Sequence, residues 1–173
     1  RCGTREAIEA AMASPSAILS RRVTQTTKDT THFRVHYDTS GVQATTHALA
    51  QQIAEIAEQV WDAEYTVLGW QPPPADALAG GDNRYDIYID PMGMTGTLAA
   101  TTPDGVSGTT GQPSHVQVNV NYYQTPWDTG SLRLALGHEL AHASQISYSL
   151  SFPDIWWYEN TANFVSEGVF EDE

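Results

Sequence analysis

A nearly uncharged stretch around two histidines is the feature that most constrains this chain. From Leu134 to Ile146 the only carboxylate is Glu139, which stands between His138 and His142 in the pattern His-Glu-x-x-His. In a helix, residues four apart share a face, so the two imidazoles can bind one metal ion. Glu139 then lies about 100° round the helix, toward a metal-bound water. The uncharged surroundings predict a helix packed on most sides.

A buried helix with two structural histidines is the alternative interpretation of this stretch. A buried Glu139 between buried histidines would then need a partner that offsets its desolvation. A catalytic zinc takes three protein ligands and keeps one position for water, so a metal site also needs a third donor. The metzincin pattern would have Gly at position 145 and His at position 148. The chain has Gln145 and Tyr148, which excludes that pattern.

Glu159 is the predicted third ligand. It follows His142 at a distance that allows one helix to end, a turn at 151–153, and a second helix to begin antiparallel to the first. Trp156, Ala162 and Phe164 are predicted to pack this second helix against its partner. Asp154 and Tyr158 remain alternative ligands.

These motifs resemble those of the gluzincin zinc metallopeptidases. Trp156-x-x-Glu159-x-x-Ala162 is similar to the glutamate-helix signature of that clan, and the resemblance implies that zinc is bound by His138, His142 and Glu159. More closely, the chain resembles a group of large secreted bacterial proteins assigned as metallopeptidases. The shared features are Arg1-Cys2-Gly3-Thr4, Arg84-Tyr85-Asp86-Ile87-Tyr88, His138-Glu139-x-x-His142-Ala143-x-Gln145, and Trp156-x-x-Glu159-x-x-Ala162 with the ending Glu171-Asp172-Glu173.

Asn163 departs from the pattern of thermolysin-like gluzincins, which have an aspartate at this position that orients the first histidine. An amide oxygen can also accept a hydrogen bond from an imidazole N–H. Asn163 is therefore predicted to orient His138 as a less basic partner.

Cys2 is the single cysteine of the chain, so it cannot form a disulfide within it. Arg1-Cys2-Gly3 is similar to the cysteine-switch segment of matrix metallopeptidase zymogens, which implies that the Cys2 thiolate fills the open position on zinc. Such a ligand would displace the water and stop hydrolysis. The alternatives are a disulfide to another part of a precursor and an unused terminal thiol.

The charge balance limits the partners. The chain has 21 acidic and 8 basic residues and a net charge of −13, which argues against nucleic acid and anionic membranes as partners. A protein or peptide substrate, a monomeric state and a secreted, extracellular location are predicted. The chain also lacks an apolar run of membrane-spanning length.

The order of elements predicts an α+β fold with one core domain. Residues 1–31 are predicted to be an N-terminal segment, a candidate pro-segment, with a short helix from Thr4 to Met12 and a strand-poor linker from 23 to 31. Arg21-Arg22 in this segment is a candidate cleavage site, with two solvated arginines as the alternative. Residues 32–173 are predicted to be a zincin-like metallopeptidase domain.

Within residues 32–173, the periodicity predicts a mixed sheet of about four strands and a long backing helix. The helix runs from Val42 to Leu68, before the metal helix and the glutamate helix. The expected strands are 32–37, 85–90, 96–102 and 115–122. In the zincin lobe that this order resembles, an edge strand pairs with extended substrate. Gly96, Thr97, Leu98, Ala99 and Ala100 are predicted to belong to that edge.

The function implied is hydrolysis of peptide bonds, with Glu139 as general base and then general acid on a zinc-bound water. The donor that stabilises the oxyanion is left open among four side chains, which are Tyr122, Tyr148, Tyr158 and His115. Two other interpretations compete with the peptidase. One is a zincin-like domain that keeps its metal but has lost turnover and serves as a binding or scaffold module, and the other is a structural domain without metal.

Overall fold

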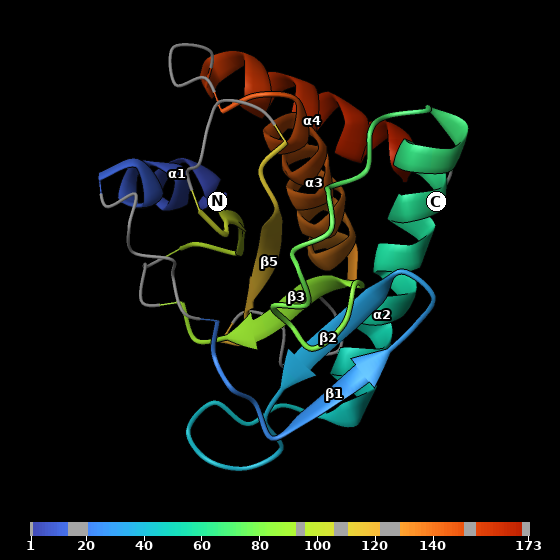
Figure 1. Cartoon of the computed structure of the whole chain (residues 1–173). Coiled ribbons are helices and arrows are strands. Elements are labelled where there is room, and N and C mark those ends of the chain that lie inside the picture. The colour runs from blue at the N-terminus through green and yellow to red at the C-terminus, as the bar shows by residue number, and fades with distance from the viewer. Residues whose placement is uncertain are drawn as a thin grey trace.

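The computed structural model describes residues 2–13, 21–92, 96–105, 111–121, 129–150 and 155–170. Within these ranges it has an α+β fold with one five-stranded mixed sheet and four α-helices (Figure 1). The predicted α+β class and mixed sheet are confirmed, with five strands where about four were predicted. In chain order the elements are α1 (Thr4–Ala13), β1 (Thr26–Asp29), β2 (Phe33–Tyr37), α2 (His47–Trp61), η1 (Asp62–Val67), β3 (Tyr85–Asp90), β4 (Ala99–Pro103), β5 (Ser114–Asn119), α3 (Thr129–Tyr148) and α4 (Ile155–Val169).

The strand order β1-β2-β3-β5-β4 places β1 and β4 at the two edges of the sheet. Strands β2, β3 and β5 are parallel to one another, whereas β1 is antiparallel to β2 and β4 is antiparallel to β5. The predicted substrate-binding stretch Gly96–Ala100 leads into β4 and supplies its first two residues. That stretch therefore lies at a sheet edge.

Strand β1 lies in the stretch 23–31 that was predicted to be a strand-poor linker. Residues 23–31 are rich in threonine, and β-branched threonine fits a strand; Thr26–Asp29 pairs with β2 from Thr26↔Tyr37 to Asp29↔Arg34. The prediction that this stretch is strand-poor was wrong. The sheet thus begins inside the predicted N-terminal segment 1–31.

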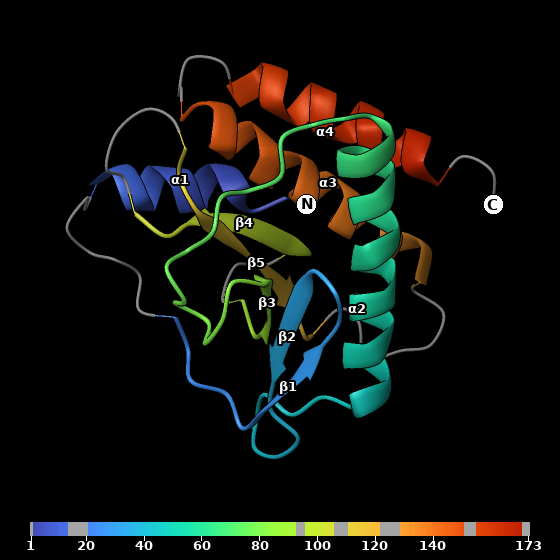
Figure 2. The same cartoon turned by 45° about the vertical axis from the view of Figure 1, so that its right-hand side comes forward.

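Helices α2 and α3 cover one face of the sheet, and this face forms the main apolar core. Alternate residues of β2, β3 and β5 point into it, as the period of two in a strand requires. Figure 2 shows α2 standing beside the sheet, with α4 crossing above α3. The buried strand residues of this core are Phe33, Val35, Tyr37, Tyr85, Ile87, Ile89, Val116 and Val118.

The helix predicted for residues 42–68 begins later than predicted and passes from an α-helix into a π-helix. It begins at His47, because the Thr46 side chain accepts a hydrogen bond from the N–H of Leu49 and caps the first turn. After Trp61 it continues as the π-helix η1, in which the N–H of Leu68 bonds to the carbonyl of Ala63. The wider π turn brings Glu64 and Tyr65 into buried positions.

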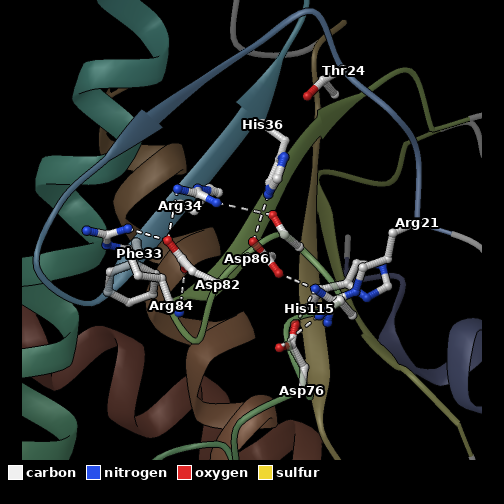
Figure 3. Close-up of polar contacts among 12 residues, drawn as sticks. Arg21, Thr24, Phe33, Arg34, His36, Asp76, Asp82, Arg84, Asp86 and His115 are labelled. Atoms are coloured by element: carbon white, nitrogen blue, oxygen red, sulfur yellow. Dashed lines mark hydrogen bonds and ion pairs between the residues drawn. The ribbon is translucent and has the colours of Figure 1, made fainter.

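The opposite face of the sheet is polar yet buried. Asp86, on β3, accepts a hydrogen bond from the His36 ring at 2.7 Å, and His115, on β5, pairs with Asp104 at 2.7 Å. Figure 3 shows Arg21 among these side chains. The paired charges explain how so many titratable groups can stay buried.

Arg21 and Arg22 are held in ion pairs with the sheet and are not freely solvated, although the Arg22 side chain is 26% exposed. Arg21 forms ion pairs with Asp76, Asp86 and Asp104, and its side chain is 7% exposed. Arg22 pairs with Asp38 and Asp90. The arginine pair therefore joins the N-terminal residues to the sheet. In the ranges that the structure describes, no helix is long and apolar enough to span a membrane.

Candidate metal centre

Helix α3 carries the His-Glu-x-x-His motif through the interior of the molecule. Every residue from Leu136 to Ser144 is buried, which confirms the predicted packing of this helix on most sides. Leu136, Leu140 and Ala143 belong to the main core with the sheet and α2. His138, Glu139 and His142 lie on the side of the helix that faces β4 and α4.

Helix α4 runs antiparallel to α3 and approaches it closely. Gln145, near the end of α3, contacts Thr161, whereas Gly137, earlier in α3, faces Ser166, later in α4. A Cβ at Gly137 would lie 3.1 Å from the Ser166 Cβ, so this glycine allows the close approach. The contact brings Glu159 to the two histidines.

Ala162 is fully buried in this contact, as predicted, but Trp156 and Phe164 are 61% and 79% exposed. The prediction that Trp156 and Phe164 pack on α3 was wrong. The buried side of α4 consists of Ala162, Val165 and Ser166. Trp156 and Phe164 are six residues before and two residues after Ala162, and at these spacings a helix points their side chains in other directions.

Four donor side chains converge on one point. Potential ligand atoms of Cys2, His138, His142 and Glu159 all lie within 4.8 Å of one another, which makes this a possible metal-binding cluster. The Nε2 atoms of the two histidines are 2.9 Å apart. The Nε2 of His138 lies 3.4 Å from Oε2 of Glu159, and the Nε2 of His142 lies 3.4 Å from the other carboxylate oxygen, Oε1. Helices α3 and α4 and the N-terminal residues thus each contribute to the cluster.

Burial and neighbouring charges shift the pKa values of the groups in the cluster. Burial would raise the pKa of Glu159, but hydrogen bonds and charge from both imidazoles hold this pKa well below its usual range. Burial would lower the pKa of His142, but the Glu159 hydrogen bond and the charges of Glu139 and Glu159 raise it. Burial, followed by the two carboxylates, raises the pKa of the Cys2 thiol. A bound cation would favour the thiolate instead.

Glu139 does not belong to the ligand cluster. Glu139 is 1% exposed, and its Oε2 accepts a hydrogen bond from the Thr4 hydroxyl at 2.5 Å. The Thr101 hydroxyl lies 3.0 Å from the same oxygen and 2.6 Å from the backbone carbonyl oxygen of Glu139, so its one proton is shared between them. The partner that a buried glutamate requires is thus supplied mainly by Thr4. Thr101 comes from β4 and fixes this carboxylate beside the sheet edge.

Gln145, which the sequence analysis did not assign, holds the second histidine. Its Oε1 lies 2.6 Å from Nδ1 of His142, while its amide donates to Thr161 and to the carbonyl of Tyr158. The i, i+3 spacing of His142 and Gln145 on one helix was the signal that could have identified it. Asn163 lines a cavity next to His138, but no hydrogen bond joins the two side chains in the described part of the chain.

A cavity of about 430 Å³ opens beside the cluster. Cys2, His138, Glu139 and Glu159 line it together with Leu98 and Ala99 of the β4 edge. Two of the three predicted metal ligands, His138 and Glu159, therefore border one space with the predicted general base and the predicted substrate-binding edge, whereas His142 lies behind them and is 1% exposed.

The candidates for the oxyanion-stabilising donor that the structure describes all have partners of their own. The Tyr148 hydroxyl accepts from the N–H of Gln71, and the Tyr158 hydroxyl donates to the carbonyl of Ser149. His115 belongs to the polar face with Asp104. Arg1, Tyr122, the turn at 151–153, Asp154 and the ending Glu171-Asp172-Glu173 lie outside the described residues.

Comparisons with family models, with curated proteins and with solved structures gave no match.

Proposed function

We propose that this chain is a zinc-dependent endopeptidase of the gluzincin type, with a zincin-like lobe, that acts on protein or peptide substrates as a secreted monomer. His138, His142 and Glu159 would be the zinc ligands, and Glu139 the general base. The observation that carries the proposal is convergence, since two imidazoles from one helix meet a carboxylate from another beside a cavity that Glu139 also lines.

The donor set fits zinc in kind and in spacing. Imidazole nitrogen, carboxylate oxygen and thiolate sulfur are the ligands that zinc takes in proteins. Two ligands about 2.0–2.1 Å from a tetrahedral zinc are about 3.4 Å apart. The contacts of Glu159 with His138 and His142 have this length, at 3.4 Å each. The two imidazoles are closer, at 2.9 Å, and would separate slightly around an ion.

Bound zinc would supply a Lewis acid and a water of lowered pKa. Glu139 accepts the proton of the attacking water and delivers it to the departing amine. Thr101 holds the Glu139 carboxylate in place through its hydroxyl. The edge formed by Gly96–Ala100 would offer backbone N–H and C=O groups to an extended peptide that displaces Gly3, whose N–H now donates to the Ala99 carbonyl.

Latency of the chain through Cys2 is part of this proposal. The Cys2 sulfur lies with the three other donors, and the N–H of Thr4 donates to it at 3.3 Å. With this thiolate as a fourth ligand, water would have no place on zinc, so the chain in this arrangement would not hydrolyse peptides.

The same four-donor arrangement supports a second candidate function. Structural zinc sites are closed by four protein ligands, whereas catalytic sites keep one open position. A site permanently closed by Cys2 would suit a zincin-like domain that has lost turnover and serves as a binding or scaffold module. Zinc-dependent hydrolysis by a chain that lacks the Cys2 thiol would favour the peptidase over this module.

The metal part of the proposal predicts one equivalent of tightly bound zinc. His138→Ala is expected to weaken zinc binding at least about 100-fold, since direct ligands matter more than their hydrogen-bond partners. Competition with a chromophoric chelator measures the affinity. His47→Ala, at an exposed histidine of α2, is the matched control and should leave zinc binding unchanged. Equal affinities of the His138→Ala variant and the unmodified chain would contradict the ligand assignment.

Gln145 is predicted to position His142 for the metal. Gln145→Leu should lower zinc affinity about 10- to 100-fold, because the imidazole then loses the partner that fixes its orientation. Gln51→Leu on α2, where the amide contacts Glu55 instead, is the control. An unchanged affinity in the Gln145→Leu chain would show that the helix alone orients His142.

A further inference from the structure

Residues 2–13, here called the capping segment, lie along the free edge of β4. Cys2 forms a parallel bridge with Ala99, and the N–H of Gly3 donates to the Ala99 carbonyl at 2.8 Å. A Cβ on Gly3 would lie 2.8 Å from Cγ2 of Thr97 and 3.0 Å from Cβ of Ala100. Only glycine therefore lets the chain approach the strand this closely.

Thr4 connects the capping segment to the proposed general base. Its hydroxyl donates to Oε2 of Glu139 at 2.5 Å and accepts from the N–H of Thr101 at 2.8 Å. Thr4 is fully buried and Glu139 is 1% exposed, so solvent does not compete at this oxygen. A hydrogen bond to a carboxylate is stronger than one between neutral groups.

Apolar contacts of α1 and the ion pairs of Arg21 and Arg22 hold the capping segment against the rest of the molecule. Ile8 of α1 packs with Ile146 and Leu150 at the end of α3, a small apolar cluster separate from the main core. Arg21 and Arg22 fix the chain to the sheet beyond α1. A capping segment that left the cavity would stay tethered at Arg21 and would return at a high effective concentration.

We propose that the Thr4 hydroxyl, independently of the Cys2 thiol, keeps the site latent by its hydrogen bond to Oε2 of Glu139. This inference rests on the proposed peptidase function and concerns its regulation. Chemical blocking or removal of the thiol frees one position on the metal but leaves Thr4 on the general base. Activation therefore requires that the Thr4 hydroxyl leaves the general base as well as that the thiol leaves the metal.

Variants of the whole chain test this directly. Cys2→Ala removes the thiol, Thr4→Val removes the hydroxyl at nearly constant shape, and the double variant removes both. Thr4→Ser keeps the hydroxyl and is the matched control. Two measurements are made, namely amide hydrogen exchange of Thr101 in zinc-free protein, and hydrolysis of a peptide mixture by protein loaded with one zinc.

The exchange measurement reports on the Thr4 contact without any activity. Exchange at the Thr101 N–H should become about fivefold to tenfold faster in Thr4→Val, because its acceptor is lost, and should be unchanged in Thr4→Ser and Cys2→Ala. Unchanged exchange in Thr4→Val would overturn the proposed contact.

The hydrolysis measurement tests its consequence. The double variant should hydrolyse peptides at least about tenfold faster than Cys2→Ala, since only the double variant lacks the Thr4 hydrogen bond to the general base. A Cys2→Ala variant as active as the double variant would overturn the role of Thr4 and leave the peptidase intact. A double variant that binds zinc and exchanges Thr101 rapidly but hydrolyses no peptide would overturn the peptidase function itself.

Discussion

Glu139→Gln, introduced together with Cys2→Ala and Thr4→Val, should lower the rate of peptide hydrolysis about 10²- to 10⁴-fold with one zinc still bound. The amide keeps the size of the side chain and its acceptor oxygen, so the hydrogen bond from Thr101 can persist. It cannot take the proton of the attacking water. Because Glu139 is not one of the four converging donors, its loss should leave the metal affinity unchanged.

Measurement of kcat/KM and of zinc content on the same sample separates the two effects. Glu167→Gln is the matched control, since Glu167 lines the same cavity from α4 but is exposed and does not belong to the donor cluster. Introduced with the same Cys2→Ala and Thr4→Val changes, Glu167→Gln should hydrolyse peptides at the rate of the Cys2→Ala, Thr4→Val double variant. A Glu139→Gln protein with undiminished kcat/KM would mean that another group takes the proton.

The elements that carry the proposed ligands could be predicted because their signals are local. The uncharged surroundings of His138 and His142 indicated a buried helix, and the residues around Glu159 indicated a second one. The helical spacing and the short connection between the two helices then limit where Glu159 can lie. The exposure of Trp156 and Phe164 could not be predicted, since the same aromatic side chains also fit a packed helix face.

The contacts of the capping segment could not be predicted, because they join residues far apart in the chain. Thr4 and Glu139 are separated by 135 positions, and no periodicity relates them. A resemblance suggested Cys2 as a ligand, but nothing in the sequence marked Thr4 or the fit of Gly3 against Thr97. Strand pairing at a free edge depends on backbone groups that every residue carries.

The buried charges on the polar face show a related limit of sequence patterns. Asp86 and His36 alternate with apolar residues, which is typical of a strand with one solvated face. The structure covers that face with Arg21 and its neighbours, so these side chains are buried instead. Alternation identified which side chains point away from the core, but not what lies over them.

Glu64 should make the stability of this protein fall as the pH rises. Its side chain is fully buried, neither carboxylate oxygen has a hydrogen-bond partner in the described part of the chain, and desolvation raises its pKa to about 9. The folded state then holds a proton that the unfolded state releases above pH about 4.5. This stabilising contribution is complete below pH about 4.5 and is lost progressively up to pH about 9, with a slope of about 1.4 kcal/mol per pH unit.

Glu64→Gln, which stays neutral, should therefore exceed the unmodified chain in free energy of unfolding by several kcal/mol at pH 8, with almost no difference at pH 4.5. Urea denaturation of zinc-free protein across this pH range measures the difference, and titration of the metal ligands cancels between the two chains. Glu55→Gln, at an exposed position of α2, should show no such trend. A constant difference between the Glu64 variant and the unmodified chain would mean that Glu64 is ionised in the folded state. The π turn that buries it would then have to bring a compensating charge or water to its carboxylate.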